Sequence, residues 1–434
     1  MANTYLSKTQ TSGNADIFTS STWVKRTSLG ELMVWCVYTG SSNYTKFGID
    51  ANDRLKYDDY QGTQHSDFVS NQRLRDVNGW YHLVCAVDTT NSTAGDRVKI
   101  YVNGVRVTSW FTQTNYPLNQ NTLVNSGNLF DINVQQAGNV TVGGLMSHYH
   151  FIDGTAYDAS YFGSTDSTTG EWKINTSPSV TYGTNGFFIL KDGNTITDSS
   201  PNSNNFSLGG GTLTKTEDNP SNVFATFNPL IHFRQPTPLL YGNTAIENGD
   251  AQWENGYGTI ATPTTGKFYA EFKYPVFGGT SYGHTGIIAV DDVATQASGY
   301  QNFGDTANSW SISVTDGRIY HNGSSSLTYS SISANGIIGL AIDCTNSKLY
   351  ISVNGTWQNS ADPSAGTGGI SITSNKEYYV GGKVYNCYIN ANYGNGYFGT
   401  TAVSSAGTNA SGIGIFEYDV PTGFTALSTK GLNQ

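Results

Sequence analysis

Residues 80–107 read WYHLVCAVDTTNSTAGDRVKIYVNGVRV, and residues 336–357 read GIIGLAIDCTNSKLYISVNGTW. When Asp88 is aligned with Asp343, both stretches reach the same ending, Val-Asn-Gly, although the second has a shorter turn. Apolar residues at every second position on both sides of a short polar turn predict a β-hairpin with one buried face. Asn-Gly then supplies the positive-φ residues of a tight turn. The two copies predict two β-sandwich domains in tandem.

The rest of the chain repeats this alternation. Strand-like runs such as ELMVWCVYTG (31–40) and GKFYAEFKYPV (266–276) are separated by turn residues, and no helical period is sustained. Strands at intervals of roughly 8–12 residues are typical of sandwiches. The 434 residues are 13% aromatic and only 12% charged, so aromatic side chains fill the cores and uncharged polar residues cover the surface. The sequence predicts an all-β fold of two tandem antiparallel β-sandwiches with little helix.

Charge excludes two classes of partner. The net charge is −10, and no cluster of lysine and arginine stands out. Phosphate backbones and anionic membrane surfaces are bound by clustered cations, so we expect no nucleic-acid partner. No apolar run approaches the ~18 residues of a membrane span, and the first residues lack a secretory signal. We therefore expect no membrane insertion.

The four cysteines are Cys36, Cys85, Cys344 and Cys387. None has CxxC spacing, so we expect free thiols that act as small core residues. Disulfides Cys36–Cys85 and Cys344–Cys387 are the alternatives within each half, but a chain without a secretory signal matures in a reducing compartment.

Several motifs resemble known families. STWVKR (21–26), the first hairpin stretch and GGLMSHYHFIDGTAYDASYF (143–162) resemble laminin G-like, concanavalin A-type jelly-roll domains, in the form common in phage virion proteins. GKFYAEFKYPV, the second hairpin stretch and PTGFTALSTKGL (421–432) resemble a SPRY domain, also a two-sheet sandwich. The Ser/Asn/Pro-rich run between them resembles the connector of marine phage structural proteins. The expected domains are a laminin G-like sandwich at 1–197, a connector at 198–230 and a SPRY-like sandwich at 231–434.

The resemblance implies a virion protein, of the marine phage tail-fibre or head-decoration type. The first hypothesis is a non-enzymatic tail fibre, spike or appendage that binds a host surface glycan or protein through sandwich loops. The alternative is a capsid or tail decoration or adaptor protein with a purely structural role. Both imply other virion proteins as partners, a homo-oligomer on the particle and synthesis in the host cytoplasm.

Sugar recognition needs aromatic platforms surrounded by amide and hydroxyl groups. Three loops have that chemistry: one near residue 110, one near residue 300 and one at residues 390–398. The candidate ligand-binding residues are Trp110, Phe111, Tyr116, Tyr300, Asn302, Phe303, Asn392, Tyr393 and Tyr397. The alternatives are Tyr/Asn-rich loop composition without a binding role in an aromatic-rich chain, or contact with a neighbouring virion subunit.

Glycoside hydrolysis needs two carboxylates that face one groove. Glu271 is alone on its strand, and the adjacent Asp58 and Asp59 diverge because successive side chains of a strand point to opposite faces. No other arrangement of nucleophile and base is evident, so we expect no catalytic residues and no enzyme.

We expect no cofactor, and calcium is the only ion that the resemblance suggests, with Asp88 and Asp153 as its candidate ligands. Asp88 and Asp343 occupy the same place before the two turns, where an Asx-type turn cap that needs no ion is the simpler role. His148 and His150 share a strand face, but no third metal ligand accompanies them.

Overall fold

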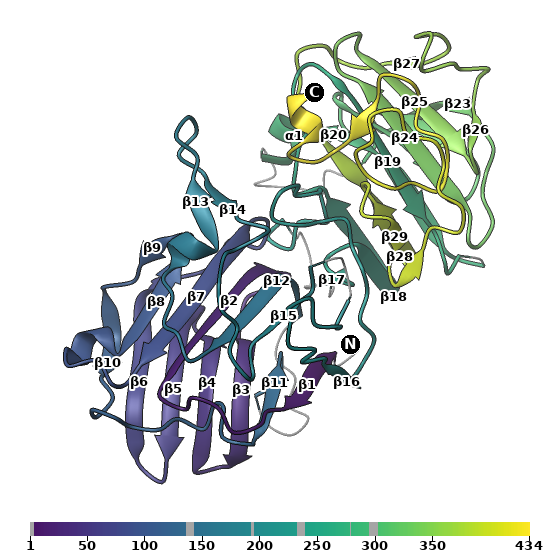
Figure 1. The fold of residues 1–434 in the computed structure, drawn as a ribbon. Helices are drawn as coiled ribbons and strands as arrows, with labels where there is room; N and C mark the ends of the chain where they lie inside the picture. Colours follow the sequence, from purple (N-terminus) through teal and green to yellow (C-terminus); the bar gives the residue numbers. More distant parts are fainter. Residues whose placement is uncertain (1–3, 136–142, 192–194, 232–238, 278, 295–302) are drawn as a thin grey trace. The chain divides into compact units, whose positions relative to one another are not determined.

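The computed structural model describes the chain except for residues 1–3, 136–142, 192–194, 232–238, 278 and 295–302. It divides into two compact units, Met1–Lys215 and Thr216–Gln434. The regular structure of both units consists almost entirely of strands, and nearly all of the strand pairs are antiparallel (Figure 1). The predicted all-β fold is confirmed.

The described residues of the first unit form sixteen strands and two 3-10 turns. They are β1 (Tyr5–Thr9), β2 (Ile17–Arg26), β3 (Leu32–Gly40), β4 (Asn43–Ile49), β5 (Arg54–Gln61), β6 (Gln64–Arg73), β7 (Trp80–Asp88), η1 (Ala94–Asp96), β8 (Val98–Val102), β9 (Val105–Arg106), β10 (Trp110–Thr114), β11 (Leu129–Ile132), β12 (Gly144–Asp153), η2 (Ala159–Tyr161), β13 (Gly163–Thr165), β14 (Trp172–Ile174), β15 (Phe187–Ile189) and β16 (Ser207–Gly210).

Two sheets enclose the core of this unit. An eight-stranded sheet has the order β10-β6-β5-β4-β3-β11-β1-β16, and a six-stranded sheet has the order β15-β12-β2-β7-β8-β9. Trp35 and Tyr57 of the first sheet are fully buried in the same core as Phe18 and Phe151 of the second. Trp35 meets Phe18 edge-on, with ring centroids 5.9 Å apart. The unit is thus a β-sandwich held together by aromatic side chains.

The second unit contains fifteen strands, one short helix and one 3-10 turn among its described residues. They are β17 (Leu239–Leu240), β18 (Ala245–Tyr257), β19 (Lys267–Lys273), β20 (Tyr282–Ala289), α1 (Val290–Ala294), β21 (Ser309–Ser313), β22 (Arg318–His321), β23 (Ser324–Thr328), β24 (Ile337–Asp343), β25 (Lys348–Val353), β26 (Thr356–Trp357), β27 (Ile370–Ser371), β28 (Tyr378–Asn392), β29 (Tyr397–Phe398), β30 (Thr401–Ala402), β31 (Thr425–Ala426) and η3 (Gly431–Asn433).

Thirteen strands of this unit are joined by hydrogen bonds into one continuous sheet, and β29 and β30 form a separate pair. The main path runs β23-β22-β21-β20-β28-β19-β24-β25-β26. The long strand β28 pairs with β20 along Tyr378–Tyr385 and with β19 along Asn390–Asn392. Asn386, between these segments, has a φ of 51°, a left-handed conformation that breaks the alternation of faces. Strands from both ends of the path contribute to one core, which includes Ile312 and Leu340.

Both copies of the repeated stretch form the predicted hairpins. Strand β7 pairs with β8, with Cys85 opposite Ile100, and β24 pairs with β25, with Leu340 opposite Ile351. All four of these side chains lie in the cores. The repeat is therefore an architectural element, the buried centre of each unit.

The stretch 198–230 is shared between the two units. Phe206 is buried in the first core, and β16 extends the first sheet by pairing with β1. Phe224 and Phe227 are buried in the second unit. Composition marked this stretch as a connector because it is rich in Ser, Asn and Pro, but its aromatic side chains place each end in a core.

All four cysteines are buried free thiols, as expected. Burial raises the pKa of Cys36 to about 12 and that of Cys344 and Cys387 to about 11. The thiols therefore stay protonated and act as small apolar residues.

Candidate functional site

The two faces of the eight-stranded sheet differ in chemistry. Along β5, Leu55 and Tyr57 point into the core, so the alternate residues Lys56, Asp58 and Tyr60 lie on the opposite, outer face. Pairing between strands aligns Lys46 of β4, Asp58 of β5 and Asp67 of β6 in one row across this face. We call Tyr44, Lys46, Lys56, Asp58, Tyr60, Gln64 and Asp67 the outer-face cluster.

Two tyrosines form its aromatic part. Tyr44 and Tyr60 are cross-strand partners, and their rings stack with centroids 5.9 Å apart and an interplanar angle of 19°. The ammonium of Lys46 lies 4.9 Å from the centroid of the Tyr44 ring. Partial burial and the neighbouring Asp58 carboxylate raise the pKa of Tyr44 to about 12. The Tyr44 phenol is therefore neutral near neutral pH, and both rings belong to the outer face of the sheet.

Asp58 is the most constrained carboxylate of the cluster. Its side chain is only 4% exposed. The Lys56 ammonium lies 3.0 Å from Oδ2, the Lys46 ammonium lies 3.9 Å from the same atom, and Gln64 Nε2 donates to Oδ1 at 2.8 Å. Three neighbours thus compensate its charge and fix its orientation.

Asp67 is less well satisfied. It is the direct cross-strand partner of Asp58, and its Oδ1 is buried without a hydrogen-bond partner. Burial raises the pKa of this carboxyl group, Lys56 opposes the shift, and the charge of Asp58 adds to it. A buried acceptor without a donor costs free energy, and a ligand hydroxyl would relieve that cost.

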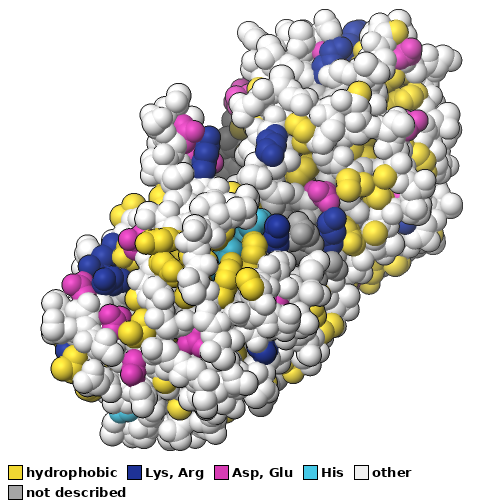
Figure 2. Space-filling view, viewed as in Figure 1, with side chains coloured by type: hydrophobic (Ala, Val, Ile, Leu, Met, Phe, Trp, Pro, Cys, Tyr) yellow, Lys and Arg dark blue, Asp and Glu magenta, His cyan; other side chains and the backbone are white. Residues whose placement is uncertain are grey.

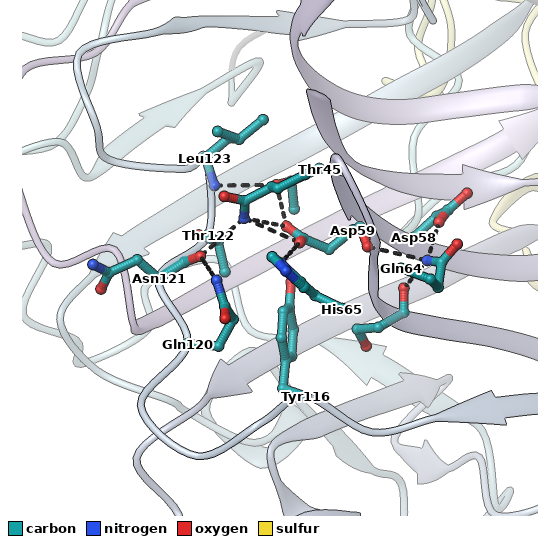
Figure 3. A network of polar contacts seen from close by, with 12 residues as sticks. Thr45, Asp58, Asp59, Gln64, His65, Tyr116, Gln120, Asn121, Thr122 and Leu123 are labelled. Atoms are coloured by element: carbon teal, nitrogen blue, oxygen red, sulfur yellow. Dashed lines mark hydrogen bonds and ion pairs between the residues drawn. The ribbon is translucent and has the colours of Figure 1, made fainter. Parts of the chain in front are cut away.

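A second polar network lies beside the cluster (Figure 3). Asp59, next to Asp58 on β5, points the other way and accepts from Thr45 Oγ1 at 2.5 Å and from Gln61 Nε2 at 3.1 Å. His65 Nδ1 lies 3.3 Å from its Oδ1, and the Tyr116 hydroxyl also hydrogen bonds to it. Burial raises the pKa of Asp59 despite these contacts.

This network holds the segment 116–123 against the sheet. Gln61 Nε2 donates to the carbonyl of Asn121 at 2.9 Å, and the N–H of Leu123 donates to Thr45 Oγ1 at 3.2 Å. Gln64 Nε2, which binds Asp58, also donates to the carbonyl of Asp59 at 3.0 Å. The network therefore helps to fix the position of Gln64, and through Gln64 that of Asp58 in the outer-face cluster.

The predicted loop near residue 110 is partly a strand. Trp110 and Phe111 lie in β10, where Trp110 packs edge-on against Phe68 at 5.0 Å. Phe111 is 66% exposed, and the guanidinium of Arg54 lies 4.1 Å from its ring centroid. Tyr116 is buried, and its hydroxyl lies 2.8 Å from that of Tyr57. Only Phe111 and part of Trp110 remain open to a ligand.

Among the predicted residues of the second unit, those that the structure describes do not form one platform. Phe303 is buried and stacks on Tyr257, with centroids 5.2 Å apart. Asn392 and Tyr393 are also buried, and the Tyr393 hydroxyl donates to the carbonyl of Val380 at 2.8 Å. Tyr397 is partly exposed in β29. Tyr300 and Asn302 lie outside the described residues. The described rings of Phe303 and Tyr393 are part of the packed interior.

The two calcium candidates have protein hydrogen-bond partners. Asp88 Oδ1 accepts from the N–H and the hydroxyl of Thr90 at 3.0 and 2.6 Å, which is an Asx-type cap. Asp153 accepts from the N–H of Asn14 at 2.8 Å and from the N–H of Asn185 at 3.0 Å. Among the described residues, no group of three His, Cys, Asp or Glu side chains is placed to hold a metal ion.

The two histidines of β12 do not make a metal pair either. The strand bulges between Ser147 and His150, and His148 has a φ of 48°. His150 stacks on Phe188 at 3.9 Å and contacts the hydroxyl of Tyr182 at 2.9 Å. Burial holds the pKa of His150 well below its usual value, so this ring packs as a neutral aromatic group.

The residues of the outer-face cluster were not among the ligand-binding candidates predicted from the sequence. A usable signal was present in TKFGIDANDRLKYDDY (45–60), where polar and apolar residues alternate around a turn at Asn52-Asp53. Alternation predicts which residues share a face, but pairing with β6 decided that Asp67 would lie opposite Asp58.

Basic side chains do not gather into one surface on the face shown in Figure 2. Lys and Arg appear there in small separate groups among uncharged polar atoms. No helix within the described ranges is both long and apolar enough to cross a membrane.

Comparison with known proteins bears on the first unit most directly. Residues 2–160 match the family model Laminin_G_3, described as the concanavalin A-like lectin/glucanases superfamily. No curated protein matches the chain. Similar solved structures include the SPRY domain of human HERC1, at 16% identity over 38% of this chain and 96% of that chain, with a TM-score of 0.31. A SAP-like pentraxin from Limulus polyphemus is 13% identical over 43% of this chain and 89% of that chain, with a TM-score of 0.28.

Proposed function

We propose that the first unit binds carbohydrate through its outer-face cluster. The chain would then be a non-enzymatic phage virion protein, a tail fibre, spike or appendage, that attaches to a host surface glycan. The observation that carries the proposal is the stacked pair Tyr44–Tyr60 on the same face as the buried, unbonded Oδ1 of Asp67. The match of residues 2–160 to a lectin-containing superfamily supports it.

The cluster has the two kinds of group that sugar recognition needs. The stacked tyrosine rings would contact the C–H faces of a pyranose, and Gln64, Lys56 and Asp67 would bond its hydroxyls. Few of these groups would be rearranged on binding, because Lys56 and Gln64 are already held by Asp58. Such preorganisation lowers the entropy cost of binding.

The contacts of Asp58 support binding without turnover. Hydrolysis requires one carboxyl group as acid and a second that is free to attack the sugar or to activate water. Asp58 is 3% exposed and fixed by Lys56, Lys46 and Gln64. It is a structural counter-ion in this arrangement, which leaves Asp67 without a catalytic partner.

A structural role in the virion is the second candidate. Val105 (71%), Phe111 (66%) and Leu118 (52%) are highly exposed apolar side chains of the first unit. Apolar side chains are the groups that protein interfaces cover, so these three would suit packing against a copy of the chain or against a capsid or tail protein. This role is compatible with glycan binding on the sheet face.

The test is a glycan array of bacterial surface polysaccharides, followed by calorimetry on any glycan that binds. Tyr60→Ala should weaken binding by at least about tenfold, whereas Tyr60→Phe, which keeps the ring, should retain most of it. Tyr161→Ala is a matched control, because Tyr161 is an exposed tyrosine of the same unit that lies outside the cluster. Equal affinities for Tyr60→Ala and the parent chain would refute the site, and release of reducing ends would refute the absence of turnover.

A further inference from the structure

A row of three aromatic rings crosses the sheet of the second unit. Trp253 of β18 and Tyr282 of β20 are both direct partners of Tyr385 on the intervening strand β28. The ring centroids of Trp253 and Tyr385 are 5.5 Å apart, those of Tyr282 and Tyr385 are 5.8 Å apart, and those of Trp253 and Tyr282 are 6.4 Å apart. Tyr282 is 47% exposed. We call these three residues the aromatic row.

A row of polar residues lies beside it on the same face. Asn255, Lys383 and His284 are direct partners on the same three strands, two positions along from the aromatic row. The Lys383 ammonium lies 5.2 Å from the ring centroid of Trp253 and 3.2 Å from Oδ2 of Asp305. His284 meets Trp253 edge-on at 5.7 Å, which joins the two rows into one surface.

One polar atom of this surface lacks a partner. The Oδ1 of Asn255 is buried and accepts no hydrogen bond. Asn255 is the direct partner of Lys383 and shares the face of Trp253. Buried acceptors are almost always bonded, so an unbonded one beside partly exposed rings indicates a missing donor. A ligand hydroxyl would supply that donor.

The geometry points to a carbohydrate site on this face, and specifically to one for a neutral hexose oligosaccharide. The aromatic row offers ring surface to pyranose C–H groups, and Asn255 and Asp305 offer acceptors to hydroxyls. Asp305 is an accessible acceptor because its side chain is 36% exposed. No residue of this site belongs to the outer-face cluster, so the proposal is independent of the first site.

Charge decides between neutral and acidic sugars. Among the described residues named for this site, Lys383 is the one cation, and the Asp305 carboxylate already compensates its charge. Burial lowers the pKa of Lys383 and holds that of His284 well below its usual value, so the imidazole adds no positive charge near neutral pH. A carboxylate or sulfate on the ligand would meet no free cation, and its desolvation would be uncompensated.

The experiment uses the full chain and defined probes. Tetrasaccharides of glucose, galactose and mannose, with matched uronic-acid tetramers, are titrated while tryptophan fluorescence and ligand saturation-transfer NMR are recorded. At least one neutral tetramer should bind, and Tyr282→Ala should weaken that binding by about tenfold or more. Tyr282→Phe should preserve it, because the ring remains.

Two further variants separate this site from the first one and from folding. Asn255→Leu removes the unbonded acceptor, so it should reduce the affinity by about tenfold without lowering the melting temperature. Tyr60→Ala, in the other unit, should leave this binding unchanged. Binding of only the uronic-acid tetramers, retention of binding by both Tyr282→Ala and Asn255→Leu, or no binding of any neutral tetramer would overturn the proposal.

Discussion

Asp58 and Asp67 lie directly opposite each other on the neighbouring strands β5 and β6. Carboxylates in paired positions repel, because their Cβ atoms are only about 4.5–5.5 Å apart. Lys56 and Gln64 compensate Asp58, whereas one oxygen of Asp67 is buried without a donor. The two carboxylates are therefore in unequal environments. Removing the charge of Asp67 should stabilise the unit, whereas removing the charge of Asp58 should destabilise it.

Asp67→Asn should stabilise the first unit by about 0.5–1 kcal/mol at neutral pH, because it removes a charge that Lys56 compensates only in part. Asp58→Asn, its matched control, should destabilise the unit, because Lys56 loses its carboxylate. Denaturant unfolding measures both. Asp67→Asn should also weaken glycan binding, since a charged acceptor makes the stronger hydrogen bond. Equal destabilisation by the two variants would contradict the asymmetry.

Glu271 should make the second unit sensitive to pH. Its carboxylate accepts from the N–H of Glu417 at 2.8 Å and of Tyr418 at 2.9 Å, and from the Tyr269 hydroxyl at 3.0 Å. Burial nevertheless raises its pKa from 4.5 to about 7. Between these values the folded chain holds a proton that the unfolded chain has lost, so this contribution to stability is complete below pH 4.5 and disappears as the pH rises through 7.

Glu271→Gln should remove that pH dependence, which is on the order of 3 kcal/mol. Denaturant unfolding of the parent chain and the variant at several pH values between 5 and 8 measures the difference in slope. Parallel profiles for the two proteins would show that Glu271 does not titrate in this range.

The asparagines that end the two hairpins should be equivalent. Asn103 has a φ of 48° and accepts from the N–H of His82 at 2.8 Å. Asn354 has the same φ and accepts from the N–H of Ile337 at 2.8 Å. Replacing either by Ala should cost about 2 kcal/mol, from left-handed strain and a lost hydrogen bond.

The glycine variants at these two positions separate strain from hydrogen bonding. Asn→Gly removes the side-chain bond but fits the left-handed conformation, so it should cost less than Asn→Ala at both sites. Urea unfolding of all four variants gives the comparison, and an Ala variant as stable as its Gly counterpart would show that strain is absent.

The four thiols should be unreactive in the folded chain, because all are buried and burial raises the pKa of each. Titration with an aromatic disulfide reagent should modify none of them rapidly in buffer and all four in guanidinium chloride. Fewer than four reactive thiols in denaturant under non-reducing conditions would indicate a disulfide.

The sequence by itself determined the fold class and the twin hairpins. Alternation of apolar residues is a local signal, and Asn-Gly turns act over a few residues. The cap at Asp88 could be read in the same way, because its partner Thr90 is two residues away. The thiol state followed from residue spacing and from the apolar runs around Cys36 and Cys85.

Only the tertiary structure decided which polar side chains meet. Asp58 meets Asp67, and Trp253 meets Tyr385 and Tyr282, through strand pairings that join distant parts of the chain. Tertiary packing also buried Tyr116, Phe303 and Tyr393, which loop composition alone had favoured as ligand contacts. Register and burial depend on the whole sheet, so residue type and local spacing could not predict either candidate site.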